Sequence, residues 1–147
     1  MESYLQLVLA DDDEDDCLLF RHALSELSLK VHLTIVHDGD DLFHLLNESE
    51  KPPAAVILDL NMPRKTGFEC LDEMQDSENF HAIPVIIFST SVPENLSIEL
   101  RKRGARDCFQ KPSEYKQLKA LILHILKMLE PEVLQRKVNS DDGNKSS

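Results

Sequence analysis

The fold is indicated most clearly by the segment Ala55-Val-Ile-Leu-Asp59-Leu-Asn-Met-Pro63. It begins with an uninterrupted apolar run that is too short for a typical helix, and it continues into a carboxylate. A second run of the same kind, Val85-Ile-Ile-Phe-Ser89, follows further along the chain. Strands whose side chains are apolar on both faces are typical of the centre of a parallel sheet that helices cover on both faces. The two runs therefore predict the middle of such a sheet.

Further apolar runs on either side complete a set of five expected strands: Leu5–Ala10, Val31–Val36, Ala55–Leu60, Val85–Ser89 and the weaker Asp107–Lys111. Segments with apolar residues at helical spacing separate and follow these strands, the first at about 13–27 and the last at about 114–129. Strict alternation of strand and helix predicts right-handed crossovers between parallel strands. The fold class is therefore α/β, as a doubly wound parallel sheet.

Helix boundaries in the second half of the chain carry clear signals. Thr66 with Glu69 and Ser91 with Glu94 both have capping-box spacing, so each pair is expected to open a helix. Gly104 is expected to end the second of these helices, which has only a thin apolar stripe. We expect that helix to be held loosely.

Composition excludes several function classes. The net charge is -11, and no stripe of lysine and arginine compensates for it, which disfavours binding to nucleic acid. The apolar start, Leu5–Ala10, is too short to cross a membrane or to act as a signal peptide. Three widely spaced cysteines and six histidines show no metal-ligand spacing. These features favour an intracellular location in the cytoplasm.

Reactive side chains follow the expected strands. The first strand is followed by Asp11 and Asp12, the third carries Asp59 near its end, the fourth is closed by Ser89 or Thr90, and the fifth ends in Lys111. In open α/β sheets ligands bind outside the carboxyl ends of the strands, so these groups are expected to share one cleft. Carboxylates that lie close together repel each other unless a hard cation such as Mg²⁺ binds between them. The sequence therefore predicts a magnesium site.

Asp59 follows a buried central strand and is the best placed nucleophile. Its carboxylate could attack a phosphoryl donor in line and form an acyl phosphate, while Lys111 neutralises the transferred charge. Phosphoryl transfer requires mainly positioning and charge stabilisation from the protein. One metal ion, one lysine and one hydroxyl would therefore be sufficient for phosphoryl transfer to Asp59.

Four segments together resemble the response-regulator receiver family, also called CheY-like: Val8-Leu-Ala-Asp11-Asp12-Asp13, Leu58-Asp59-Leu-Asn-Met-Pro63, Ile87-Phe-Ser89-Thr-Ser91 and Lys111-Pro112. The resemblance covers residues 4–130 and implies a five-stranded, flavodoxin-like sheet of order 2-1-3-4-5. We expect residues 131–147 to be a polar, disordered tail.

The family resemblance also implies a role for each site residue. Asp12 would be a direct metal ligand that Asp11 supports, and the backbone carbonyl of Asn61 would complete the protein's ligands with Asp59. Asp59 would accept the phosphoryl group from the phosphohistidine of a sensor histidine kinase or phosphotransfer protein. Ser89 would be the hydroxyl that hydrogen-bonds the new phosphoryl group, with Thr90 as the alternative. Lys111 would pair with the phosphoryl group. Such a protein catalyses only its own phosphorylation and dephosphorylation.

The chain is similar to short receivers without an output domain, including those that accompany bacterial phytochrome kinases. The residues after Pro131 are too few for an effector domain, so we expect the output to be a protein–protein interaction. The last helix has an apolar arc that is broader than packing on a sheet requires, because Leu121, Leu123 and Met128 flank the core stripe. This surplus predicts a homodimer or a kinase contact through the fourth and fifth helices.

Some features depart from the family pattern or allow other functions. The acids Asp13–Asp16 exceed what a metal site needs and are interpreted as favouring a helix N-terminus. Cys108 stands where receivers carry an aromatic residue, and Phe109, one step later, should point to the opposite face of the sheet. A receiver-like binding module without phosphorylation would lack an acid, the acceptor or the lysine, and none is missing. A phosphatase of the haloacid-dehalogenase type would need a second aspartate where Asn61 stands.

Overall fold

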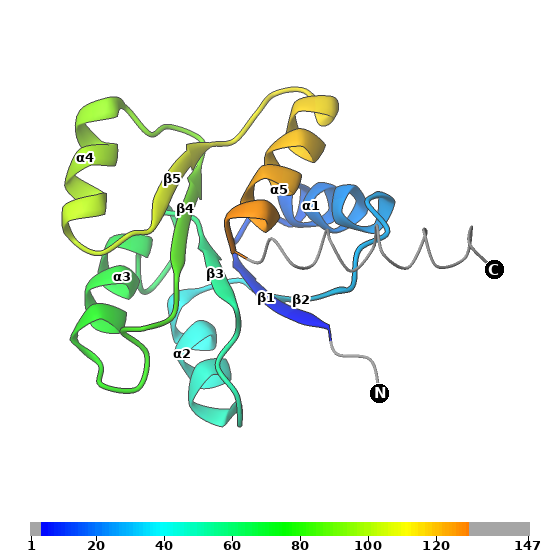
Figure 1. Cartoon of the computed structure of the whole chain (residues 1–147). Coiled ribbons are helices and arrows are strands. Elements are labelled where there is room, and N and C mark those ends of the chain that lie inside the picture. Colours follow the sequence, from blue (N-terminus) through cyan, green and yellow to red (C-terminus); the bar gives the residue numbers. More distant parts are fainter. Residues whose placement is uncertain (1–3, 130–147) are drawn as a thin grey trace.

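A twisted five-stranded sheet forms the centre of the molecule (Figure 1). The computed structural model describes residues 4–129. All strand pairs are parallel and the order is β2-β1-β3-β4-β5, as the sequence resemblance implied. The strands are β1 (Leu5–Ala10), β2 (Val31–Val36), β3 (Ala55–Leu58), β4 (Val85–Ser89) and β5 (Asp107–Gln110). The third and fifth strands are slightly shorter than expected, so Asp59 and Lys111 lie just beyond strand ends.

Within residues 4–129, five helices cover both faces of the sheet, which confirms the doubly wound α/β fold (Figure 1). They are α1 (Glu14–Glu26), α2 (Gly39–Glu48), α3 (Gly67–Asp76), α4 (Glu94–Lys102) and α5 (Tyr115–Leu129). Helices α1 and α5 lie together on one face, and α2, α3 and α4 lie on the other. In residues 4–129, no helix combines the length and the apolar character that a membrane span requires.

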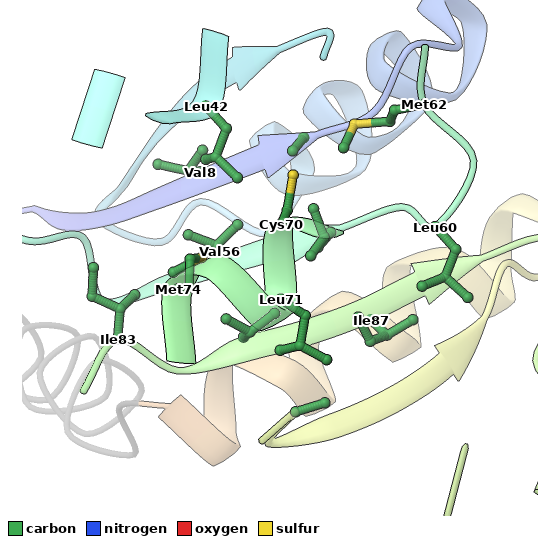
Figure 2. Packing of buried hydrophobic residues seen from close by; sticks show 14 of the residues in the cluster. Val8, Leu42, Val56, Leu60, Met62, Cys70, Leu71, Met74, Ile83 and Ile87 are labelled. Atoms are coloured by element: carbon green, nitrogen blue, oxygen red, sulfur yellow. The ribbon is translucent and has the colours of Figure 1, made fainter. Parts of the chain in front are cut away.

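Each face of the sheet has its own apolar core, because successive side chains of a strand point to opposite faces. In β3, Val56 and Leu58 belong to the core under α2, α3 and α4, whereas Ala55 and Ile57 belong to the core under α1 and α5. Figure 2 shows the first of these cores, with Leu71 and Met74 of α3 against the sheet. All four residues of β3 are buried, as expected for a central strand.

The same alternation separates Cys108 from Phe109 in β5. Cys108 is buried in the core under α2, α3 and α4, while Phe109 packs against the other core. The prediction that Phe109 points to the opposite face is therefore confirmed. Burial also raises the pKa of the Cys108 thiol, which fits a small core residue.

One of the two predicted helix caps is confirmed and the other is wrong. Thr66 and Glu69 form a reciprocal capping box at the start of α3. Helix α4 instead begins at Glu94 with Pro93 as its N-cap, and no side chain caps it. Ser91 lies two residues before the cap, outside the position from which a side chain bonds the first turn. Gly104 ends α4 with a φ of 111°, as predicted.

The apolar surface is distributed differently from the expectation. Leu121, Leu123 and Met128 of α5 are only partly exposed, and Leu121 packs against the core. The largest exposed apolar side chains on helices are instead Leu18 (64%) and Leu19 (47%) of α1 and Ile98 (48%) of α4. Leu100 is the only buried residue of α4, which confirms that this helix has few apolar anchors.

Candidate functional site

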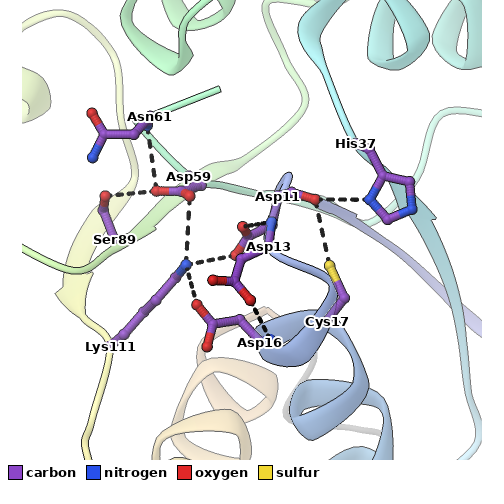
Figure 3. A network of polar contacts seen from close by, with 9 residues as sticks. All are labelled: Asp11, Asp13, Asp16, Cys17, His37, Asp59, Asn61, Ser89 and Lys111. Carbon is purple, nitrogen blue, oxygen red and sulfur yellow. Dashed lines mark hydrogen bonds and ion pairs between the residues drawn. The ribbon is translucent and has the colours of Figure 1, made fainter. Parts of the chain in front are cut away.

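The carboxyl ends of four strands bring the expected polar residues into one cluster (Figure 3). Parallel pairing causes this arrangement, because neighbouring strands end at the same edge of the sheet. The backbone N–H of Asp59 donates to the carbonyl of Ala10 at 3.0 Å, and that of Lys111 donates to the carbonyl of Ser89 at 2.8 Å. The ladder therefore fixes the acids, the hydroxyl and the lysine relative to one another.

Asp59 lies in the middle of the cluster. The hydroxyl of Ser89 donates to its Oδ1 at 2.6 Å, and the ammonium of Lys111 lies 3.4 Å from its Oδ2. Asp59 and Ser89 are both buried. Thr90 is exposed, so of the two candidate hydroxyls it is Ser89 that contacts the carboxylate. Each oxygen of Asp59 thus faces a hydrogen-bond donor.

Three carboxylates form a candidate metal site. One oxygen each of Asp11, Asp12 and Asp59 lies within 4.8 Å of the others, and Asp12 is exposed to solvent. Oδ2 of Asp11 is fully buried, and the ammonium of Lys111 lies 2.7 Å from it. Such a donor set suits a hard cation that keeps several waters, because carboxylates are its preferred ligands. The residues present therefore fit a divalent ion.

Asn61 lies beside the cluster but takes part through its backbone. Its N–H faces Oδ1 of Asp59 at 3.4 Å, and its side chain is exposed. The role of its carbonyl as a metal ligand stays a prediction.

Asp16 belongs to the cluster, although sequence reasoning interpreted it only as a helix N-terminal acid. Its Oδ2 lies 2.8 Å from the ammonium of Lys111. The helical period could have indicated this position, because Asp16 precedes the buried Phe20 by four residues and such residues share a face. Asp13 is the N-cap of α1, since its Oδ1 accepts the N–H of Asp16 at 3.0 Å.

Two further residues support the loop after β1, and neither was a predicted site residue. The carbonyl of Asp11 faces Nδ1 of His37 at 3.1 Å and the thiol of Cys17 at 3.4 Å. Burial raises the pKa of Cys17 to about 12, so its thiol stays protonated. Both contacts hold the backbone of Asp11.

The cluster also changes proton affinities. Burial raises the pKa of Asp11 from 3.8 to about 6, and the charge of Asp59 adds to this, while Lys111 and the N–H of Asp13 oppose it. Burial alone would lower the pKa of Lys111, but hydrogen bonds to Asp11 and Asp16 and nearby negative charge raise it above its ordinary value. Lys111 is therefore cationic at neutral pH.

The raised pKa of Asp11 predicts a pH-dependent stability of the metal-free protein. A carboxyl group that binds its proton more tightly when folded favours folding below pH 4, and this contribution is lost as pH rises through about 6. The loss is at most about 3 kcal/mol. We expect the free energy of unfolding of the wild type to fall more steeply over this range than that of Asp11→Asn, measured by urea titration in a chelator. Equal slopes would contradict the prediction.

Comparison with known proteins identifies the family. The family model for the response regulator receiver domain matches residues 7–123. The chain belongs to the response regulator receiver family. Receivers of this family are components of two-component phosphorelays, and the acidic cluster of Asp11, Asp12 and Asp59 fits the metal site of a receiver domain.

Several relatives resemble this receiver over much of its length. Response regulator Rcp1 of Synechocystis sp. is 30% identical over 94 residues, which are 60% of this chain and 64% of that protein. The structure of Mn²⁺-bound Rcp1 is 26% identical, with a TM-score of 0.75 over 85% of this chain and 94% of that one. The bacteriophytochrome response regulator RtBRR is 29% identical, with a TM-score of 0.71 over 82% and 77%. The receiver spans from 6% to 64% of the first three curated relatives that it matches.

Proposed function

We propose that this receiver accepts a phosphoryl group on Asp59 from a phosphohistidine of a sensor histidine kinase or phosphotransfer protein, in a reaction that depends on Mg²⁺. The arrangement around Asp59 carries the proposal. Its two carboxylate oxygens face a hydroxyl at 2.6 Å and an ammonium at 3.4 Å. Two further carboxylates lie close enough to share a cation with it. This is the set of groups that phosphoryl transfer requires.

The reaction follows from this arrangement. A carboxylate oxygen of Asp59 forms a bond to phosphorus while the phosphorus–nitrogen bond of the donor breaks. The electron pair of that bond stays on the donor imidazole, which takes up a proton, and Asp59 becomes an acyl phosphate. The hydroxyl of Ser89 and the ammonium of Lys111 can then donate to phosphoryl oxygens. The chain's own groups thus position the acceptor and stabilise the added charge.

The metal would be held by Asp11, Asp12, Asp59 and the carbonyl of Asn61. A bound Mg²⁺ ion would neutralise clustered negative charge and stabilise the phosphoryl oxygens. The manganese in the Rcp1 structure supports a divalent ion in a similar protein. We further propose that the receiver turns over no other substrate and catalyses only its own phosphorylation and dephosphorylation.

Metal removal tests the proposal directly. After incubation with a small phosphodonor and Mg²⁺, intact mass spectrometry of the wild type is expected to show one added phosphoryl group. With a chelator in place of Mg²⁺ the added mass should be absent, because the clustered carboxylates would then repel the anionic donor. No added mass in either condition would favour a binding module that works without phosphorylation. Release of phosphate from a soluble ester would favour a phosphatase.

The net charge of the protein and its similarity to known response regulators indicate what kind of partner it binds. A net charge of -11 opposes contact with nucleic acid or anionic membranes, so we propose a protein partner in the cytoplasm. Because RtBRR is described as a bacteriophytochrome response regulator, a phytochrome-type kinase is the first partner to test.

We also propose that the phosphorylated receiver forms a homodimer through α4 and α5. Ile98 of α4 is 48% exposed and few apolar anchors hold that helix, so it can adapt to a partner. Sedimentation should show a dimer after phosphorylation, and Ile98→Ser should weaken it. Leu18→Ser, which removes an exposed leucine from α1, is the matched control and should have no effect. A monomer before and after phosphorylation would rule out the dimer.

A further inference from the structure

The ammonium of Lys111 is surrounded by three carboxylates, and the phosphoacceptor is the most distant of them (Figure 3). Nζ lies 2.7 Å from Asp11 and 2.8 Å from Asp16, but 3.4 Å from Asp59. A lysine ammonium has three N–H donors, so each carboxylate can occupy one of them. Within this cluster, Asp16 of α1 therefore lies closer to the ammonium of Lys111 than Asp59 does.

The position of Asp16 follows from how α1 packs on the sheet. Phe20, one turn after Asp16, meets the ring of Phe88 edge-on at 5.8 Å between centroids. Phe88 is also the ring over which the ammonium of Lys111 lies, at 5.8 Å. Both α1 and Lys111 thus contact the ring of Phe88. The side chain of Asp16 is 31% exposed and that of Lys111 only 9%, so the pair is partly shielded from water.

We propose that Asp16 is a positioning residue that competes with the phosphoryl group for Lys111 and thereby weakens the site's hold on a phosphoryl group at Asp59. The proposal rests on the proposed function of Asp59. A phosphoryl group brings strong acceptor oxygens that need the donors of Lys111. A carboxylate that already holds this ammonium opposes the transfer of those donors. Asp16 thus sets how firmly the phosphorylated state is held.

The affinity for beryllium fluoride in the presence of Mg²⁺ measures this hold, because beryllium bonded to three fluorides and one oxygen of Asp59 has the tetrahedral shape of a phosphoryl group. Asp16→Asn is expected to tighten binding about three- to tenfold, between the small effect of an exposed ion pair and that of a buried charge-assisted hydrogen bond. Asp15→Asn is the matched control, since it removes one charge from an exposed position in the same helical turn. Asp16→Glu keeps the carboxylate and should bind as the wild type does.

A double-mutant cycle shows whether Asp16 acts through Lys111. In a Lys111→Gln background, Asp16→Asn should have no more effect than Asp15→Asn. If that background binds beryllium fluoride too weakly to measure, the same cycle is followed by initial rates of phosphoryl uptake. Equal tightening by both asparagine variants, weaker binding by Asp16→Asn, or an effect that persists without Lys111 would each overturn the proposal. A wild type that takes up no phosphoryl group would instead overturn the proposed function.

Discussion

Replacing Asp59 by asparagine is expected to abolish phosphoryl uptake. The amide oxygen carries no full negative charge and is a poor nucleophile, so the bond to phosphorus cannot form. The substitution keeps the size of the side chain and an acceptor for the hydroxyl of Ser89, which now donates to Oδ1 at 2.6 Å. The loss should therefore reflect chemistry rather than packing. The measurement is intact mass after incubation with a small phosphodonor and Mg²⁺.

Asp15→Asn is the control for this experiment, because Asp15 is exposed on α1. It should take up one phosphoryl group as the wild type does. Circular dichroism of Asp59→Asn should show an intact fold. If this variant gained the phosphoryl group at the wild-type rate, another residue would be the acceptor, and the role given to Asp59 would be wrong.

Of the substitutions discussed for this protein, Gly67→Ala is expected to lower the free energy of unfolding most. Gly67 is the first residue of α3, and its N–H donates to the carbonyl of Leu60 at 3.0 Å. A Cβ atom there would lie 2.2 Å from the carbonyl oxygen of Asp59 and 2.7 Å from Cα of Leu60. Both are backbone atoms, so no rotamer change can relieve the contact. We expect the free energy of unfolding to fall by about 3 kcal/mol, at the upper end for overpacking.

Gly39→Ala provides the comparison, since Gly39 is the first residue of α2. A Cβ atom there would meet Cβ and Cγ of Lys65 and Sγ of Cys70 rather than backbone atoms; the Cγ and the thiol can change rotamer, whereas the Lys65 Cβ moves only with its own backbone. It should cost less stability than Gly67→Ala in urea titrations. Gly67→Ala should also slow phosphoryl uptake, because the displaced carbonyl belongs to Asp59 itself. A Gly67→Ala protein as stable as Gly39→Ala would contradict this account of the close approach.

Local pattern was enough to predict most of the architecture. The apolar runs before Asp59 and up to Ser89 are strands because buried central strands lack polar positions, and the structure confirms both. Thr66 with Glu69 is a real capping box because both partners lie within one helical turn. Ser91 with Glu94 has the same spacing, but Pro93 took the cap position and moved the helix start. Spacing alone does not distinguish these two cases.

The strands, the helices and the order in which the acids, the hydroxyl and the lysine follow them could all be predicted from the amino-acid sequence. These properties depend on residues that are close along the chain, and parallel pairing then brings the strand ends together. The contact between Asp16 and Lys111 depends on tertiary packing, because the two residues are 95 positions apart and meet only when α1 packs on the sheet. The exposure of the leucines on α1 likewise depends on tertiary packing, since the packing of neighbouring elements determines which side of an amphipathic helix is covered.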